Sequence, residues 1–202
     1  MKLSHLVAIM IGFSSMMPIA TFAADIEAGK AKSALCAGCH GPDGNSFAAT
    51  WPKLAGQHAN YLVKQLKEYK TGVRVDPTMT GMASILDDQG MDDVAAYFAS
   101  QVSKPVAFDQ SKIALGETIY RGGITQGSIP ACMACHGPDG SGNAPAKFPS
   151  LKNQHADYTV AQLKKFRDGS RSNDTAGMMR NIAVRMTDDE MMAVAAYIAG
   201  LK

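Results

Sequence analysis

The chain has 202 residues, of which 46% are hydrophobic and 19% charged, with four cysteines and a formal net charge of +2. This length suits one medium domain or two small ones, and the weak charge excludes a nucleic-acid binder, which would carry a clustered basic face. Residues 24–103 hold seven basic and nine acidic side chains, a charge of −2, whereas residues 104–202 hold twelve and nine, a charge of +3. The asymmetry predicts a dipolar molecule that a charged partner can orient.

The first predicted element is a secretory signal peptide over residues 1–23. The segment has a basic start and then an apolar run over residues 6–17. Small residues follow, with Thr21 and Ala23 at the positions that a signal peptidase recognises. The alternative is a permanent membrane anchor, which is disfavoured because serine and proline interrupt the run and no basic stop-transfer flank follows. No later segment is long and apolar enough to span a bilayer.

The rest of the chain is an internal duplication. Three stretches of the first half recur in the second. CAGCHGPDGNS, which begins at Cys36, recurs 96 residues later as CMACHGPDGSG, which begins at Cys132. Residues 51–74 match residues 148–171 at an offset of 97, and residues 92–100 match residues 192–200 at an offset of 100. We therefore predict two copies of one unit, over residues 24–101 and 111–202, with a linker over residues 102–110. Each copy is small for a self-supporting core.

Each copy predicts three helices and no clear strand, so the predicted fold class is all-α. The first copy has helices over residues 26–36 and 58–71 and a third that starts at 87–90; the second has them over 112–121 and 155–168 and a third that starts at 187–190. Thr187 and Glu190 form a capping box at that last start. A Gly-Gly pair ends the helix over 112–121 early, which lengthens the loop before the second cysteine motif.

Both C-x-x-C-H motifs predict the same chemistry. They supply Cys36, Cys39 and His40 in the first copy, and Cys132, Cys135 and His136 in the second. Cysteines three apart on a helical turn lie on one face, so both thiols can form thioether bonds to one haem while the adjacent histidine binds its iron. In an exported chain the motif is typical of c-type haem attachment, and its duplication predicts two covalently bound haem c groups.

Three other interpretations of the cysteines are weaker. A thioredoxin-like dithiol would need a βαβ context. A four-cysteine zinc site would have to join pairs 96 residues apart and would leave the histidines without a role. A disulfide within C-x-x-C would close too short a loop to stabilise the fold much.

The second axial ligand of each iron follows from the register of the repeat. At the offset of 100 residues, Met79 aligns with Met179, and both are expected in loops before the final helix. Met82 and Met178 have no methionine partner and are the fallback candidates. We therefore predict two low-spin haems with His/Met ligation, because a thioether sulfur favours Fe(II) and raises the reduction potential.

Two further aligned pairs have other roles. Met91 and Met191 fall within the final helices, where methionine commonly fills the core. His58 and His155 each start a middle helix, where a surface or capping role is favoured over iron ligation.

As a set, the motifs resemble the dihaem cytochromes c4, exported electron-transfer proteins of bacteria. The resemblance covers nearly all of the mature chain and rests on CAGCHGPDGNS, PKLAGQ, YLVKQL, MTGM and DDVAAYF, then YRGG, PACMACHGPDGSGN, FPSL, QHADYTVAQLKKFRDGSRSND, MMR and VAAYIAGL. It implies two class I cytochrome c domains related by a pseudo-twofold axis, with the haem propionate edges meeting at the interface, and axial methionines at Met79 and Met179. It also implies that the carbonyls of Pro52 and Pro149 accept the proton on the far nitrogen of each haem histidine.

A haem with both axial positions filled predicts outer-sphere electron transfer and no enzyme activity. We expect a soluble or loosely membrane-associated periplasmic carrier, which takes electrons from a quinol-oxidising complex and passes them to a terminal oxidase or reductase. One alternative is the haem subunit of a larger dehydrogenase, as in flavocytochrome c sulfide dehydrogenase. The other is a dihaem peroxidase, which would need a displaceable ligand and a nearby acid or base.

Overall fold

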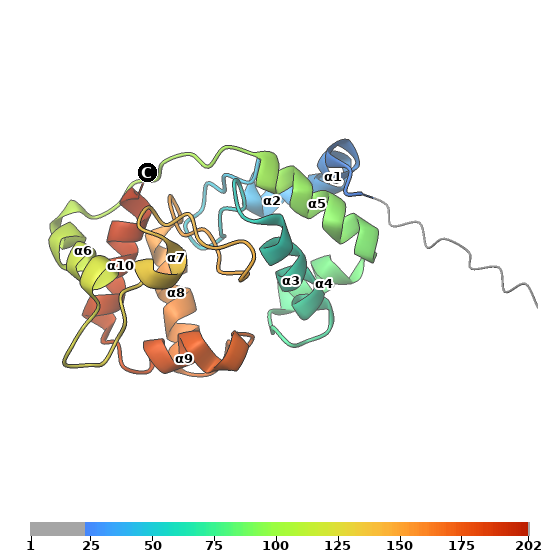
Figure 1. Ribbon diagram of the computed structural model, residues 1–202. Coiled ribbons are helices and arrows are strands. Elements are labelled where there is room, and N and C mark those ends of the chain that lie inside the picture. The colour runs from blue at the N-terminus through green and yellow to red at the C-terminus, as the bar shows by residue number, and fades with distance from the viewer. Residues whose placement is uncertain (1–22, 202) are drawn as a thin grey trace, which may run out of the picture.

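The computed structural model describes residues 23–201, so the predicted signal segment lies outside the described residues except for Ala23. Figure 1 shows two helical domains side by side, joined along the top of the view by the segment over residues 101–109. The predicted all-α class is confirmed, since residues 23–201 contain only two isolated β-bridges, Ile124 with Ile129 and Asn143 with Phe148, both in loops.

The N-terminal domain contains five α-helices: α1 (Ile26–Lys32), α2 (Ala37–His40), α3 (Ala59–Lys70), α4 (Pro77–Ser84) and α5 (Asp88–Ser100). The predicted first helix ends earlier than expected and continues as a 3₁₀ turn, η1 (Ser33–Leu35), which leads into the cysteine motif. The middle helix agrees with its prediction to within one residue at each end.

The C-terminal domain repeats this order with α6 (Ile113–Gly122), α7 (Met133–His136), α8 (Ala156–Arg167), α9 (Met178–Ala183) and α10 (Asp188–Gly200), plus the 3₁₀ turns η2 (Gln110–Lys112) and η3 (Thr175–Gly177). The capping box at the start of α10 is confirmed, because Thr187 accepts from the Glu190 amide and Glu190 accepts from the Thr187 amide. The early end of α6 is confirmed as well.

The expectation that Met79 and Met179 lie in loops is wrong, because they lie on α4 and α9. Sequence periodicity missed both helices because eight and six residues are too few to show an amphipathic pattern. The start of α4 has a local cause, since Asp76 accepts from the Met79 amide and proline occupies the first turn.

In each domain the first helix crosses the last one closely, α1 on α5 and α6 on α10. A Cβ atom placed on Gly29 would lie 2.0 Å from the Asp93 carbonyl oxygen, and one on Gly116 would lie 2.1 Å from that of Ala193. Only glycine permits backbones this close. Met91 and Met191 are fully buried beside these crossings, so the core-filling role predicted for both is confirmed.

Two reciprocal glutamines join the domains. Gln57 donates to the Ser150 carbonyl and accepts from the Ser150 amide, both at 2.9 Å. Gln154 donates to the Lys53 carbonyl at 3.0 Å and accepts from the Lys53 amide at 2.9 Å. Because these residues correspond in the repeat at an offset of 97, the contacts are the exchanged pair that a pseudo-twofold axis requires.

Between residues 23 and 201, no helix has the length and apolar character needed to cross a membrane.

Candidate functional site

Each cysteine motif folds into a single helical turn, α2 or α7. The His40 amide donates to the Cys36 carbonyl at 3.0 Å, and the His136 amide donates to the Cys132 carbonyl at the same distance. Gly41 follows with a φ of 77°, which turns the chain sharply away after the histidine. The turn holds both cysteines and the histidine of each motif together.

Both motif histidines are buried and oriented by a backbone carbonyl. The Nδ1 atom of His40 lies 2.8 Å from the Pro52 carbonyl oxygen, and that of His136 lies 3.0 Å from the Pro149 carbonyl oxygen. Because a carbonyl only accepts, Nδ1 carries the proton and the Nε2 lone pair is free to bind a metal. Burial lowers the pKa of both imidazoles against the opposing effect of these hydrogen bonds, which favours the neutral form needed for ligation.

No disulfide joins any of the four motif cysteines, which all lie in the described residues. Burial raises the pKa of the Cys36 thiol, and it raises that of Cys132 to about 11. Catalytic dithiols need a lowered pKa, so this environment disfavours a thioredoxin-like function. Among residues 23–201, no group of three or more His, Cys, Asp or Glu side chains is placed to hold a metal ion.

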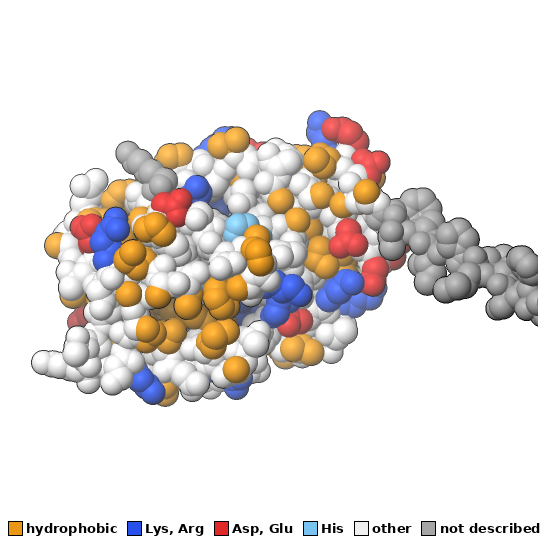
Figure 2. Space-filling model, in the orientation of Figure 1, with side chains coloured by type: hydrophobic (Ala, Val, Ile, Leu, Met, Phe, Trp, Pro, Cys, Tyr) orange, Lys and Arg blue, Asp and Glu red, His pale blue; other side chains and the backbone are white. Residues whose placement is uncertain are grey.

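One cavity of about 480 Å³ runs through both domains and their interface. The site residues that line it are Cys36, His40, Pro52 and Met79 from the N-terminal domain, and Cys132, Cys135, His136, Pro149 and Met179 from the C-terminal domain. Cys39 is half-buried and lies outside this lining. Figure 2 shows hydrophobic side chains gathered over a hollow on the C-terminal domain, between α7 and α9.

The methionine candidates differ in position. Met79 lines the cavity, whereas its fallback Met82, one turn later on α4, does not. In the C-terminal domain both Met178 and Met179 line the cavity, but Met179 packs against the hydrophobic core and Met178 is 38% exposed. Packing in both domains therefore favours the pair that the repeat register predicts.

His58 and His155 occupy the residue before α3 and α8, as the sequence predicts, and both are half-buried, but neither side chain accepts a capping hydrogen bond. The Nε2 atom of His155 instead lies 3.0 Å from Ser46 Oγ in the other domain. The Nε2 atom of His58 is buried without a hydrogen-bond partner in the described part of the chain. Neither histidine lines the cavity.

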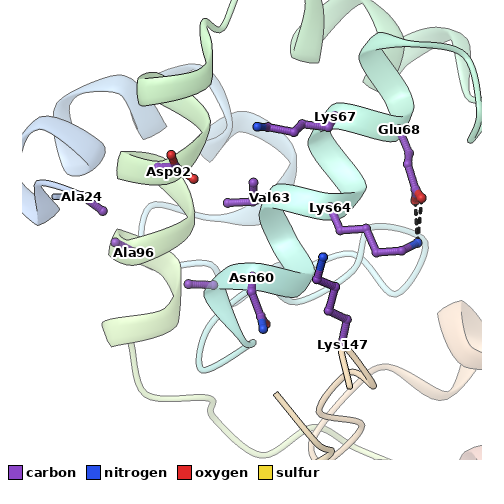
Figure 3. Close-up of a pocket in the computed structure, with 10 residues that line it drawn as sticks. Ala24, Asn60, Val63, Lys64, Lys67, Glu68, Asp92, Ala96 and Lys147 are labelled. Carbon is purple, nitrogen blue, oxygen red and sulfur yellow. Dashed lines mark hydrogen bonds and ion pairs between the residues drawn. The ribbon is translucent and has the colours of Figure 1, made fainter. Parts of the chain in front are cut away.

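A second hollow, of about 560 Å³, lies beside α3 and α5 (Figure 3). Charged side chains surround it, including the ion-paired Lys64 and Glu68, and Lys147 reaches it from the C-terminal domain. No cysteine, histidine or methionine lines it, so it lacks the ligands of a haem site.

The cavity wall also contains Arg74 and Arg171, which sequence reasoning did not single out. A signal was present, because the two arginines end the matched stretches of the repeat at the offset of 97. Surface arginines are common, however, and only the tertiary structure places these two inside.

The lining fits two haem groups. Each half of the cavity offers a neutral histidine with a free Nε2, a thioether sulfur and at least one thiol of the motif, within a largely apolar wall. These are the donor types that a c-type haem needs.

Known proteins share this arrangement. The sequence model of the family described as "Cytochrome c" matches residues 26–101 and again 113–202. Cytochrome c4 of Thiocapsa roseopersicina is 49% identical, over 88% of this chain and 93% of that protein. The crystal structure of reduced cytochrome c4 from Pseudomonas stutzeri superposes with a TM-score of 0.86 at 44% identity, covering 89% of this chain and all of that one. A thiosulfate dehydrogenase electron acceptor of Stutzerimonas stutzeri is 42% identical, over 82% of this chain and 78% of that protein.

Two matched domains, a shared all-α architecture and a duplicated C-x-x-C-H site identify the chain as a dihaem protein with two covalently bound haem c groups. The chain belongs to the cytochrome c family and, within it, to the cytochromes c4.

Proposed function

We propose that the protein is an exported electron carrier in which Cys36 and Cys39 attach one haem and His40 and Met79 ligate its iron. In the second domain, Cys132 and Cys135 attach the other haem, with His136 and Met179 as axial ligands. The proposed domains extend over residues 24–101 and 111–202, with residues 102–110 as the linker.

When bound, each haem supplies a one-electron Fe(III)/Fe(II) couple. The chain's own residues hold that couple in place. The Pro52 and Pro149 carbonyls fix the tautomer and the ring orientation of the two histidines, so that each Nε2 is presented to the iron. A methionine from α4 or α9 lines the cavity with each of them and would supply the thioether sulfur as the second ligand of a bound haem iron.

The observation that carries the proposal is the matched set of a carbonyl-bound histidine and a cavity-lining methionine in both domains. With both residues bound, neither haem would keep an open coordination position, so this set favours electron transfer over peroxidase chemistry. The direct test is spectroscopic. The oxidised protein should show the far-red sulfur-to-iron charge-transfer band, and the reduced protein should not bind carbon monoxide. Rapid carbon monoxide binding at either haem would contradict the assignment.

For the pathway, we propose a periplasmic carrier, soluble or loosely attached to the membrane, between a quinol-oxidising complex and a terminal oxidase or reductase. The opposite charges of the two halves, −2 over residues 24–103 and +3 over residues 104–202, favour docking of different partners on different domains. Rates of reduction and oxidation by the isolated complexes should therefore depend on ionic strength. Rates that ignore salt would remove this docking hypothesis.

A second candidate function is to accept electrons from a dehydrogenase, and one observation favours it. The 42% identical relative from Stutzerimonas stutzeri is an electron acceptor of thiosulfate dehydrogenase. Stopped-flow reduction of the protein by a purified thiosulfate dehydrogenase and thiosulfate distinguishes the candidates. Reduction faster than that by a quinol-oxidising complex would place the protein in this second pathway.

A further inference from the structure

The two copies of the repeat differ in the segment that leads to the cavity-lining methionine. Residues 51–74 recur at an offset of 97, whereas Met79 and Met179 align at an offset of 100. The C-terminal domain therefore holds three additional residues, the difference between 100 and 97, ahead of Met179. The insertion lies in the loop between α8 and α9, and it gives this domain a feature that the other copy does not share.

Two consecutive residues of this loop have left-handed backbones. Ala176 has a φ of 52° and a ψ of 21°, and Gly177 has a φ of 70° and a ψ of 19°. The helix α9 begins at the next residue. Alanine is unfavourable in this conformation because its Cβ crowds the backbone. A turn of this kind persists only where other contacts hold it in place.

Asp174 makes those contacts. Its carboxylate reaches past both left-handed residues to Arg180, so that Oδ2 accepts from the Arg180 amide at 3.0 Å and Oδ1 accepts from the guanidinium Nε at 2.8 Å. We call these two bonds the Asp174 clamp. Only 4% of the Asp174 side chain is exposed, and charge-assisted hydrogen bonds are strong when they are shielded from water. Arg180 directly follows Met179, so the clamp fixes the first turn of α9, which carries the methionine.

The other end of the loop is anchored on the N-terminal domain. The Asn173 side-chain amide donates to the Glu68 carboxylate of α3 at 2.6 Å, and the Asn173 carbonyl accepts from Lys64 at 2.9 Å. Asn173 is buried. The strained turn is thus held from the other domain at its start and by the clamp at its end. A movement of α9 away from the cavity would have to break one of these contacts.

We propose that Asp174 is a positioning residue for Met179, and that its clamp holds the methionine at the cavity wall, where the sulfur would ligate the iron of the C-terminal haem. The proposal rests on the ligation proposed above. The N-terminal domain solves the same problem differently, because Asp76 accepts from the Met79 amide itself and the two residues between them are already helical. Loss of the Asp174 carboxylate should therefore loosen the methionine of one haem and leave the other unchanged.

The test is the displacement of each methionine by imidazole in the intact, oxidised dihaem protein. The NMR signals of the two ligated methyl groups, assigned with Met79→Ala and Met179→Ala, report the two haems separately. The wild type is measured first by mass spectrometry for two covalent haems and by NMR for both signals, because a failure there overturns the proposed function itself. Asp168→Asn is the matched control, since Asp168 is an exposed carboxylate of the same domain that accepts from Ser170.

In Asp174→Ala, imidazole should displace the methionine of the C-terminal haem about tenfold faster, the effect of losing a hydrogen bond to a charged group. The reduction potential of that haem should fall, because a thioether ligand favours Fe(II). Arg180→Gln keeps the backbone amide and loses the guanidinium, so its effect should be smaller. The N-terminal haem and the control should behave as in the wild type. No acceleration, or equal acceleration at both haems, would overturn the proposal.

Gly177→Ala provides a second test if Asp174→Ala does not mature. A Cβ atom on Gly177 would meet no atom closer than 3.6 Å, so the substitution fits the available space and adds only the strain of a left-handed alanine. It should accelerate displacement at the C-terminal haem alone. A displacement rate equal to that of the wild type would refute the role of the clamped turn.

Discussion

The reciprocal glutamines provide the sharpest test of the interface. In Gln57→Ala, two hydrogen bonds to the backbone of Ser150 disappear, and in Gln154→Ala the equivalent two to Lys53 disappear. A lost hydrogen bond costs about 0.5–1.5 kcal/mol, and a partly buried backbone group left unpaired adds to that. We therefore expect each variant to lose about 2 kcal/mol of stability, a fall of about 4–8 °C in Tm for a chain of this size.

Thermal unfolding of the oxidised dihaem protein, followed by circular dichroism, measures this loss. Gln101→Ala is the matched control, because Gln101 donates only within its own domain, to the Tyr97 carbonyl and the Ser100 hydroxyl. The far-red band adds a second readout for Gln57→Ala. Gln57 binds Ser150 in the other domain, and Ser150 follows Pro149, whose carbonyl orients His136. If Gln57→Ala shifts the Tm no more than the control does, the domains are not held together by these contacts and the reasoning fails.

Three further outcomes follow from the same structure. Met79→Ala and Met179→Ala should each remove about half of the far-red charge-transfer band, while Met82→Ala should leave it intact; a band lost with Met82 would reassign the ligand. Gly116→Ala should destabilise the C-terminal domain by more than about 1–3 kcal/mol, the usual cost of overpacking, because its Cβ would lie 2.1 Å from a backbone carbonyl of α10. Denaturant unfolding measures this loss of stability. A variant as stable as the wild type would refute the close crossing of α6 and α10. The pKa of Asp93 is lowered to about 2 by hydrogen bonds from the Asp25 amide, Lys32 and Gln89. The stabilisation that Asp93 contributes is therefore present above its unfolded pKa of about 4 and is lost as the pH falls toward 2. Asp93→Asn should flatten the acid limb of the stability profile, and an unchanged limb would show that other carboxylates control it.

Much of the fold follows from local sequence. The middle helices carry an amphipathic pattern over three turns, and α10 carries a complete capping box, so both were predicted closely. The helices α4 and α9 were missed because they are short, and their starts depend on Asp76 in one case and on the left-handed Gly177 in the other.

The site divides in the same way. The motif cysteines and histidines are adjacent in the chain, so spacing alone brings them together. The bonds from His40 to Pro52 and from His136 to Pro149 span 12 and 13 residues, and they entered the prediction only through the family resemblance. The contact of His155 with Ser46 was not predicted, because its partner comes from the other domain, which local sequence does not reveal.

From its residues the chain already specified a duplicated all-α unit that carries one haem-attachment turn per copy, because both properties depend on neighbours within a few helical turns. Folding of the whole chain settled how the copies meet, which methionine reaches the cavity and where Arg74 and Arg171 lie. The meeting of the copies and the places of the two arginines depend on contacts between residues about 80–110 positions apart, whose energies arise only after the domains pack.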